Sequence, residues 1–374
     1  MTDCRIALFI NAPGGGGISR MVVRLAIALH QRGCQVDLLV DRQSGKSYLH
    51  PDTLPTAIRV VDLDCPIRGG TLQSLRLLPA LVRYLRRDRP ALLLCHLTRV
   101  NGAAALAQRF APATRLVLVE HLPLPPPAGR GARLARSLRP WLYRQAGAIV
   151  AVSADLARDF AQQLHLPPTH VRTIYNPVVS PQLAQLAAAE LPHPWLQPDA
   201  PPVILAIGRL VPQKDFATLV RAAALLHQQR SLRLVILGSG PQQAELLALA
   251  TSLGLADNLL LPGYVENPYA YLSRAAVLAL SSRFEGLPTV LIEALACGCQ
   301  VVATDCPHGP REILAGGRYG QLVPVGDAIS LASALETALR EPIAADSLRS
   351  RADDFSVEQA VDHYLRLIPE QAAG

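Results

Sequence analysis

The chain has 374 residues, of which 50% are hydrophobic and 17% are charged. This composition excludes a disordered or fibrous protein, and the length indicates two domains because single hydrophobic cores stop growing at about 250–300 residues. The net charge of +7 is unevenly divided, since residues 1–200 carry 23 Lys and Arg against 12 Asp and Glu (23 − 12 = +11) and residues 201–374 carry 13 against 17 (13 − 17 = −4).

Short apolar runs alternate with helical patterns along nearly the whole chain, which predicts parallel β-sheets covered by α-helices. In the first half, strands are predicted at residues 5–11, 35–40, 58–63, 91–97, 115–121, 148–153 and 171–175. A proline-rich segment without a strand signal follows, and a second series has strands at 203–208, 232–238, 259–264, 276–281, 300–304 and 320–324. Two such Rossmann-like domains in tandem predict a ligand cleft at the carboxyl ends of their strands.

The first predicted strand runs into four glycines at 14–17, directly before a helical pattern over 18–31. Such a loop lets the backbone approach a ligand closely, and the helix start offers free N–H groups to an anion. A P-loop is excluded because no Gly-Lys-Ser/Thr follows, whereas Asp41 keeps a dinucleotide-binding oxidoreductase open as an alternative. A plain tight turn is equally compatible. Gly238 begins a similar loop in the second half, where Gln243 occupies the last glycine position of a G-x-G-x-x-G pattern.

The segment GRLVPQKD at 208–215 follows the first strand of the second half and carries Arg209 and Lys214. An Arg and a Lys at a strand end can neutralise a diphosphate, the first through its forked guanidinium and the second as a point charge. The alternative is a pair of solvated surface charges. Lysine occupies only positions 46 and 214 in this chain, whereas arginine occupies the other basic positions, and this favours a specific role for Lys214.

A second polar segment, RFEGLPTVLIE at 283–293, precedes and enters a predicted helix. Pro288 suits the first turn of that helix, whose N–H groups at Thr289 and Val290 can bind an anion. Glu285 and Glu293 would repel a diphosphate, so at a nucleotide-sugar site we expect them to face hydroxyl groups.

These segments resemble glycosyltransferase family 4, whose members are retaining nucleotide-sugar transferases of GT-B fold. The resemblance rests on the Glu-x7-Glu spacing within FEGLPTVLIEALACGCQVVATD, on GRLVPQKDF, on LGSGPQ and on the N-terminal glycine loop, and it covers almost the whole chain. The stretch CPHGPREIL at 306–314 is similar to the subgroup that builds bacterial cell-surface polysaccharides and lipid-linked oligosaccharides. The resemblance implies an acceptor-side domain at 1–180, a connection at 181–202, a donor domain at 203–355 and a C-terminal helix at 356–374 that crosses back onto the first domain.

Site residues follow from the resemblance by position. It implies that Arg209 and Lys214 neutralise the donor diphosphate, that Glu285 holds donor-sugar hydroxyls and that Glu293 binds the ribose. It also implies donor contacts from a further set of residues: Gly16, Gly17, His121, Gly238, Tyr264, Val265, Gly286 and Leu287. We predict His96, Arg99 and Asn101 as candidates for contact with the acceptor or the donor sugar, because they follow the neighbouring strand.

The predicted reaction moves a sugar from a nucleoside diphosphate sugar, with a UDP-hexose or UDP-N-acetylhexosamine favoured, to a hydroxyl of a glycan or lipid-linked acceptor. Because no carboxylate pair of the glycosidase kind is evident, we expect front-face attack with retention, assisted by the leaving phosphate. We expect no cofactor and no metal, since the basic clamp makes a metal unnecessary. Two alternatives remain, a sugar-nucleotide epimerase of the same two-domain form and a non-catalytic nucleotide-sugar binding subunit.

The remaining predictions concern location and partners. No apolar run approaches the roughly 20 residues of a membrane-spanning helix, and the first ten residues are typical of a strand rather than a signal peptide, so we expect a cytoplasmic protein. Residues 130–145 interleave arginines with leucines and Trp141, which fits either an anionic membrane surface or an ordinary surface helix. Nucleic acid is disfavoured as a partner because aromatic residues make up only 5% and no binding motif is present. The seven scattered cysteines are interpreted as buried apolar residues.

Overall fold

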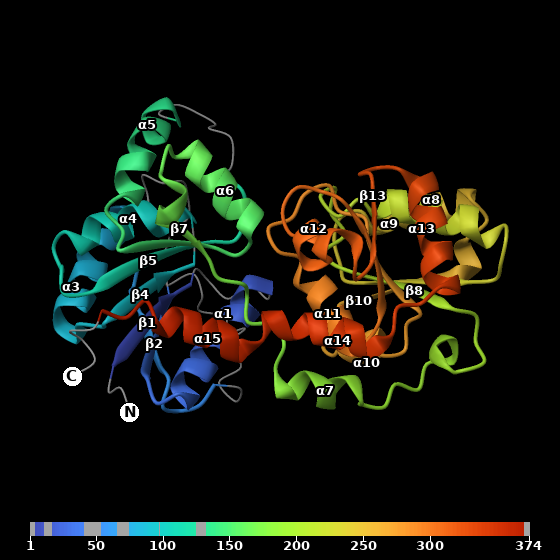
Figure 1. Ribbon diagram of the computed structural model, residues 1–374, viewed down its shortest axis with the longest axis horizontal. Helices are drawn as coiled ribbons and strands as arrows, with labels where there is room; N and C mark the ends of the chain where they lie inside the picture. Colours follow the sequence, from blue (N-terminus) through green and yellow to red (C-terminus); the bar gives the residue numbers. More distant parts are fainter. Residues whose placement is uncertain are drawn as a thin grey trace. The chain divides into compact units, whose positions relative to one another are not determined.

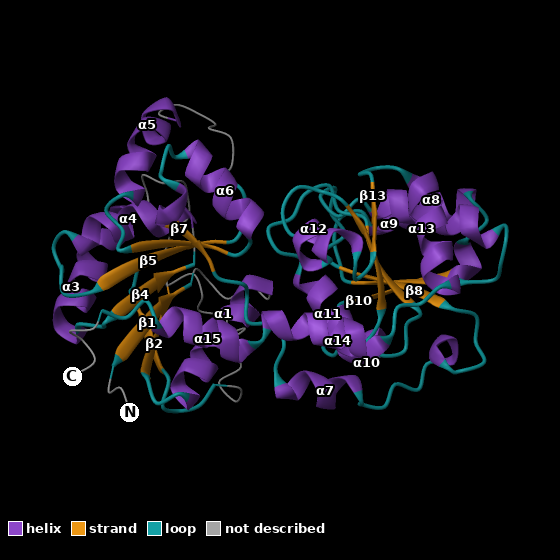
Figure 2. Ribbon diagram, viewed as in Figure 1, coloured by secondary structure: helices purple, strands orange, loops and turns teal. Residues whose placement is uncertain are grey.

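A computed structural model describes residues 4–10, 17–40, 54–65, 75–96, 98–124 and 132–369. The chain divides into two compact units (Figure 1). The first unit consists of Met1–Pro177 together with Val357–Gly374, and the second unit consists of Val178–Ser356. Each unit is built on one parallel sheet with helices on both faces (Figure 2). The two Rossmann-like sheets confirm the predicted fold class.

The sheet of the first unit has the strand order β3-β2-β1-β4-β5-β6-β7, and all neighbouring strands are parallel. Its strands are β1 Arg5–Phe9, β2 Gln35–Val40, β3 Arg59–Asp62, β4 Leu92–Cys95, β5 Arg115–Glu120, β6 Ala148–Ala151 and β7 Val171–Thr173. Its helices are α1 Gly17–Gln31, α3 Leu78–Asp88, α4 Thr98–Gln108, α5 Ala132–Tyr143, α6 Ala154–Gln163 and α15 Val357–Leu365. The order reverses between β1 and β4, and ligands of such sheets bind beside that reversal at the carboxyl ends of the strands.

Helix α1 forms because its apolar residues recur at helical spacing, and Met21, Leu25 and Leu29 are buried along that face. The helix ends at Gln31, and Gly33 two residues later has a φ of 86° that only glycine adopts without strain. Helix α15 belongs to the first unit although it comes last in the chain, and it packs against α1. Arg32, just after α1, forms an ion pair with Asp362 of α15.

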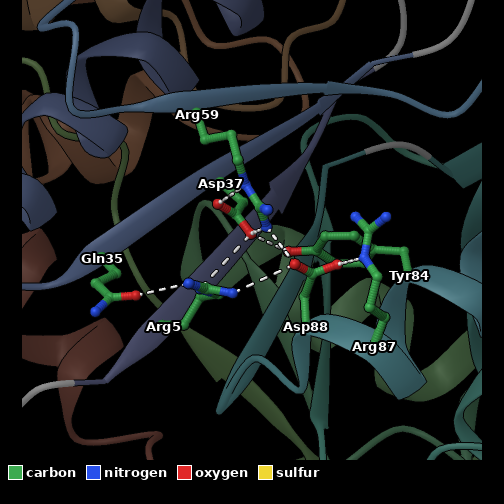
Figure 3. Close-up of polar contacts among 7 residues, drawn as sticks. All are labelled: Arg5, Gln35, Asp37, Arg59, Tyr84, Arg87 and Asp88. Atoms are coloured by element: carbon green, nitrogen blue, oxygen red, sulfur yellow. Dashed lines mark hydrogen bonds and ion pairs between the residues drawn. The ribbon is translucent and has the colours of Figure 1, made fainter.

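An ionic cluster ties α3 to the sheet near the amino ends of its first strands (Figure 3). The buried carboxylate of Asp37 accepts hydrogen bonds from Arg59 at 2.9 and 2.5 Å and from the Tyr84 hydroxyl at 2.6 Å. Asp88 at the end of α3 accepts from the same Arg59 at 2.7 Å and from Arg5 at 3.3 Å. Every carboxylate of the cluster is therefore paired with an arginine, and we assign the cluster to the stability of the fold.

The second unit repeats the topology, with the strand order β10-β9-β8-β11-β12-β13 in a parallel sheet. Its strands are β8 Val203–Ile207, β9 Arg233–Leu237, β10 Leu259–Gly263, β11 Val277–Leu280, β12 Gln300–Thr304 and β13 Gln321–Val323. Its helices are α7 Pro181–Ala187, α8 Phe216–His227, α9 Gln243–Ser252, α10 Tyr269–Leu272, α11 Thr289–Cys297, α12 Pro310–Ile313, α13 Ala328–Arg340 and α14 Ala345–Ala352. Helices α8, α9 and α13 pack together, as do α10, α11 and α14. The reversal of strand order falls between β8 and β11.

The proline-rich segment 181–202 begins with the α-helix α7, which packs against α10 and α11 of the second unit. Carbonyl groups at the end of α7 accept hydrogen bonds from this unit, with Asn267 donating to Leu186 at 2.8 Å and Ser273 donating to Ala187 at 2.8 Å. The segment predicted as a connection is therefore docked on the second unit over its first half.

Most strands begin or end one or two residues inside the predicted ranges. The difference matters at the carboxyl ends, where His96, His121 and Ser281 lie just beyond β4, β5 and β11 rather than within them. Such positions face the loops where α/β proteins bind ligands. Among the residues that the structure describes, no helix combines the length and apolar character needed to cross a membrane.

Candidate active site

The best-defined polar cluster of the second unit lies where its strand order reverses. Lys214 belongs to the loop between β8 and α8, and Glu285 belongs to the loop between β11 and α11. The Lys214 ammonium donates to Glu285 Oε1 at 2.6 Å, and the Lys214 and Glu285 side chains are 18% and 8% exposed. The two residues that the sequence placed in separate roles therefore form one partly buried ion pair.

Ser282 shares this contact, since its hydroxyl donates to the same Oε1 of Glu285 at 2.6 Å. Two donors on one oxygen fix the carboxylate, and neither of these two contacts uses Oε2. The Ser282 backbone is held in turn, because its carbonyl accepts from Thr304 at 2.6 Å. The neighbouring Ser281 hydroxyl donates to the Lys214 carbonyl at 2.8 Å. Lys214 and Glu285 are thus anchored both through their side chains and through adjacent backbone.

Backbone contacts join the two loops. The Arg283 amide donates to the Gln213 carbonyl at 2.8 Å, and the Gln213 side chain donates to the Phe284 carbonyl at 2.9 Å. Arg283 also pairs with Asp215 at 3.0 Å. These crossed contacts fix the spacing between the strand ends before any ligand arrives, which is the preorganisation that electrostatic catalysis requires.

Arg209 differs from Lys214. Its side chain is exposed, and it forms no hydrogen bond or ion pair with any residue that the structure describes. Lys214 instead lies across the backbone of Gly208, where an added Cβ would be 3.2 Å from Lys214 Cε. The loop therefore offers one basic group already paired with a carboxylate and one that is available to an incoming anion.

The loop before α11 is covered by the segment 306–312. Gly309 has a φ of 98°, and a Cβ there would lie 2.5 Å from Pro288 Cδ and 3.1 Å from Leu287 Cα. The close approach explains the glycine, and it brings Gly309, at the start of α12, beside Gly286 and Leu287. Helix α11 begins after Pro288 with no side-chain cap, so its first N–H groups remain available to an anion.

Of the other predicted donor residues of this unit, Gly238, Tyr264 and Val265 follow strand ends at the same edge of the sheet. Glu293 is in α11 and is contacted weakly by the Tyr269 hydroxyl at 3.4 Å. Tyr264 follows β10 and is 65% exposed, and Val265 comes next. Close packing alone explains the glycine at position 238, because a Cβ there would be 2.0 Å from the Gly208 carbonyl oxygen. The contact brings the loop after β9 against the loop that carries Arg209.

The first unit brings together two predicted residues, His96 and His121, which follow the adjacent strands β4 and β5. Nδ1 of His96 is 3.1 Å from Nε2 of His121, and the two side chains are 1% and 7% exposed. Burial lowers the pKa of His121 to about 4 and lowers the pKa of His96 well below its usual value. Both rings are therefore neutral at pH 7.

Glu120, directly before His121, is fully buried and anchors the helices that flank the pair. Its carboxylate accepts from Thr98 at 2.6 Å, from Asn101 at 2.6 Å and from the Tyr143 hydroxyl. Burial raises the pKa of Glu120, whereas these three donors oppose the rise. Asn101, predicted as an acceptor contact, is fully buried, and its amide is engaged with Glu120.

Several predictions fall outside what the structure describes. Gly16 and most of the glycine loop lie outside the described residues, and Gly17 is described only as the first residue of α1. Arg99 lies in α4, but its side chain is likewise outside the description, as are the side chains at 132–136. Among the described parts of the chain, no group of three His, Cys, Asp or Glu residues could hold a metal ion.

Sequence reasoning overlooked the residues that position the site. Ser282, Gln213 and Thr304 hold the Lys214–Glu285 pair, and Thr98 with Tyr143 holds Glu120. The first group carried a signal, because polar residues directly beyond a buried strand lie at the ligand edge of a parallel sheet. Tyr143 had no such signal in the sequence, because only the packing of α5 brings its hydroxyl to Glu120 at the end of β5.

Two parallel-sheet units in tandem, the second with a basic and acidic cluster at its point of strand reversal, match the architecture of the GT-B glycosyltransferases. Residues 15–180 match the family model described as Glycosyltransferase Family 4, and residues 189–355 match Glycosyl transferases group 1. The chain belongs to glycosyltransferase family 4.

Sequence similarity to known proteins covers nearly the whole chain. An N-acetylgalactosamine-N,N'-diacetylbacillosaminyl-diphospho-undecaprenol 4-alpha-N-acetylgalactosaminyltransferase of Campylobacter jejuni is 31% identical over 346 residues, which are 90% of each chain. The lipopolysaccharide core biosynthesis glycosyltransferase LpsE of Rhizobium meliloti is 28% identical over 94% of this chain and 96% of its own. The crystal structure of Anabaena HepE in complex with UDP and glucose has a TM-score of 0.76 at 21% identity, covering 98% and 99% of the two chains, which shows a shared fold.

Proposed function

We propose that this protein is a retaining glycosyltransferase that moves a sugar from a nucleoside diphosphate sugar to a hydroxyl of a lipid-linked glycan or a polysaccharide. The acceptor class is suggested by the Campylobacter relative, whose name specifies a diphospho-undecaprenol substrate, and by the lipopolysaccharide enzyme of Rhizobium. A UDP-hexose or UDP-N-acetylhexosamine is the favoured donor. In support, the Anabaena structure of the same fold binds UDP and glucose.

The observation that carries the proposal is the different surroundings of the two basic residues, since Arg209 is exposed whereas Lys214 is paired with Glu285. Departure of a nucleoside diphosphate places negative charge on its terminal phosphate, and stabilisation of that charge is the main catalytic demand. Arg209 is exposed and unpaired among the described residues, so it can engage the diphosphate through two N–H groups at once. Lys214 is already fixed beside Glu285, so it supplies a positive charge without reorganisation.

Glu285 would then bind the sugar of the donor. Its Oε1 is held by Lys214 and Ser282, and we assign Oε2 to a hydroxyl of the donor sugar near the anomeric carbon. In the reaction, the bond between the anomeric carbon and the phosphate oxygen breaks, and the acceptor oxygen forms its bond on the same face. The leaving phosphate takes the acceptor proton. Glu293 would bind the ribose, and Tyr264 with Val265 would border the base.

A donor screen tests this function. The purified protein is titrated with UDP-, GDP- and ADP-linked hexoses and N-acetylhexosamines, and the products are analysed with and without a lipid-linked acceptor. We expect binding of one nucleotide class and sugar transfer that requires the acceptor. Conversion of the donor alone into an isomeric sugar nucleotide would favour an epimerase, and binding without any turnover would favour a non-catalytic subunit. Either result would contradict the proposal.

We also propose a peripheral contact with an anionic membrane through 130–145, based on α5. Leu138 and Trp141 of this helix are 47% and 46% exposed, so two large apolar side chains lie on its outer surface. Arg139 and Arg144 lie beside them in the sequence, so the surface combines apolar and basic character. Co-sedimentation with liposomes is expected to require anionic lipid and to weaken in Trp141→Ala. Equal binding to neutral and anionic liposomes, or none, would refute this contact.

A further inference from the structure

His96 and His121 present an unfilled hydrogen-bonding requirement at the carboxyl edge of the first sheet. Their rings face each other through Nδ1 of His96 and Nε2 of His121, 3.1 Å apart. The other nitrogen of each ring, Nε2 of His96 and Nδ1 of His121, is buried without a hydrogen-bond partner among the described residues. Buried polar atoms in native proteins nearly always have a partner, whether protein, water or ligand. The described residues therefore leave two hydrogen-bonding positions of this contacting pair open to water or a ligand.

The backbone around the pair is fixed. The His96 amide donates to the Phe9 carbonyl at 3.2 Å, and the Glu120 carbonyl accepts from the Val152 amide at 3.2 Å. Glu120 does not form a carboxylate–imidazole contact, because its two oxygens are taken by Thr98, Asn101 and Tyr143. The histidines therefore interact with each other, and Glu120 beside them already has its own hydrogen-bond partners.

The tautomers of the two rings are consequently linked. A neutral imidazole carries one N–H, so one ring must donate and the other accept across the 3.1 Å contact. If His96 donates from Nδ1, His121 accepts at Nε2 and carries its own proton on Nδ1. If His121 donates from Nε2, His96 accepts at Nδ1 and carries its proton on Nε2. In both cases the two rings have the same tautomer.

We infer that His96 and His121 act as one hydroxyl-binding unit, in which the tautomer of His96 decides whether the outer nitrogen of His121 donates or accepts. The outer nitrogens always have opposite roles, one as a donor and the other as an acceptor. A sugar hydroxyl suits either end because it both donates and accepts. His96 is thus a positioning residue that acts through His121, in addition to offering its own outer nitrogen to a hydroxyl. The identity of the hydroxyl as part of a sugar rests on the proposed function.

The linkage has a consequence for bound sugar. A hydroxyl that accepts from Nδ1 of His121 makes Nε2 of His96 an acceptor, whereas a hydroxyl that donates to the same Nδ1 makes Nε2 of His96 a donor. Binding at one end therefore sets the preference at the other end, while both rings remain neutral. The lowered pKa values of both histidines are consistent with this requirement.

Nitrogen NMR of the full-length protein labelled with 15N-histidine tests the linkage directly. The chain has ten histidines, and spectra of His96→Asn and His121→Asn assign the two that matter. At pH 7 we expect both rings to carry the proton on Nδ1, or both on Nε2. Opposite tautomers, or a charged imidazolium in either ring, would overturn the inference whether or not the protein transfers sugar.

Ligand addition tests the hydroxyl site. UDP alone and UDP-N-acetylglucosamine, UDP-N-acetylgalactosamine and UDP-glucose are added to the labelled protein in turn. A sugar nucleotide that binds is expected to shift the outer nitrogens of both rings together, whereas UDP alone leaves them unchanged. If a sugar nucleotide binds and neither ring responds, water fills the site and the inference is wrong. If none binds, the proposed donor class fails, and the tautomer measurement still decides the linkage.

Variants of His96 separate positioning from packing. His96→Phe retains a ring but removes the bond to His121, whereas His96→Asn retains an amide near the place of Nδ1. Because a hydrogen bond of this kind contributes about tenfold in an equilibrium or rate, we expect kcat to fall about tenfold in His96→Phe and to recover partly in His96→Asn. His227→Asn is the matched control, since Asn258 Nδ2 is 3.2 Å from Nε2 of His227 in the other unit. Loss of linked tautomers in the control, or equal kcat in His96→Phe and the wild type, would contradict the inference.

Discussion

The Lys214–Glu285 pair predicts that Lys214 stabilises the second unit, whereas Arg209 of the same loop between β8 and α8 does not. Lys214→Met removes the cation beside the Glu285 carboxylate, whose side chain is 8% exposed, and leaves the hydrogen bond from Ser282 in place. Removing one partner of a buried ion pair costs about 3–5 kcal/mol. Because the Lys214 side chain retains 18% exposure, water compensates part of this cost. We therefore expect a loss of about 3 kcal/mol in the free energy of unfolding of the second unit.

Arg209→Met is the matched comparison because Arg209 is exposed and unpaired among the described residues. Exposed substitutions of this kind usually change stability by no more than about 0.5 kcal/mol. Both variants are expected to lose nearly all transfer activity, since each removes a positive charge from the diphosphate. We therefore expect Lys214→Met to lose both stability and activity, and Arg209→Met to lose activity alone.

Calorimetry of the full chain measures the difference. A loss of about 3 kcal/mol in a unit of this size lowers its Tm by roughly 6–12 °C. Hydrogen exchange should show reduced protection around β8 and β11 in Lys214→Met, and the double variant Lys214→Met/Glu285→Gln should recover part of the loss because it removes the uncompensated charge. A wild-type Tm in Lys214→Met, or an equal decrease in Arg209→Met, would refute the ion-pair argument.

Three further predictions concern pH, close packing and positioning. Since burial lowers the pKa of His121 to about 4, the stability it contributes is complete above about pH 6.5 and is lost as pH falls toward 4, by at most about 1.4 kcal/mol per pH unit. The raised pKa of Glu120 acts in the opposite direction, so the measured quantity is the difference between urea unfolding curves of the wild type and His121→Asn. Gly309→Ala is expected to cost about 2 kcal/mol more than Gly326→Ala, because both have positive φ but only the former would place a Cβ against a neighbouring loop, 2.5 Å from a proline ring. Ser282→Ala is expected to lower kcat about fivefold to tenfold through the loss of one hydrogen bond, with a smaller effect on donor KM.

Each of these has an outcome that would contradict it. Unfolding curves of wild type and His121→Asn that differ by a constant amount from pH 7 to pH 4 would show that His121 is not neutral by burial. Equal thermal stability of the two glycine variants would show that the loop tolerates a Cβ at Gly309. An unchanged kcat in Ser282→Ala would show that Lys214 alone orients the carboxylate.

The fold was predictable because its signals are local. Alternating buried strands and amphipathic helices predicted both parallel sheets, and the helical pattern over 18–31 predicted α1. Glu285, Glu293, Arg209 and Lys214 were identified because they occupy fixed positions in short motifs next to strand ends.

Contacts between motifs were not predictable from spacing. Lys214 and Glu285 are 71 residues apart, and their pairing depends on β8 and β11 being neighbours in the sheet. The same holds for His96 and His121, which were treated as separate candidates although β4 and β5 bring their rings together. Sequence patterns identify which residues lie at the edge of a sheet, and strand order decides which of them meet.

The central claim is that Arg209 engages the diphosphate of the donor, and nucleotide binding tests it most directly. Calorimetric titrations compare UDP, GDP and ADP with the corresponding monophosphates, in the wild type and in Arg209→Met. A charge-assisted hydrogen bond contributes about 1.5–3 kcal/mol. We therefore expect the wild type to bind one diphosphate roughly 10-fold to 150-fold more tightly than its monophosphate, and Arg209→Met to lose most of that preference. An undiminished preference for the diphosphate in Arg209→Met would contradict the account.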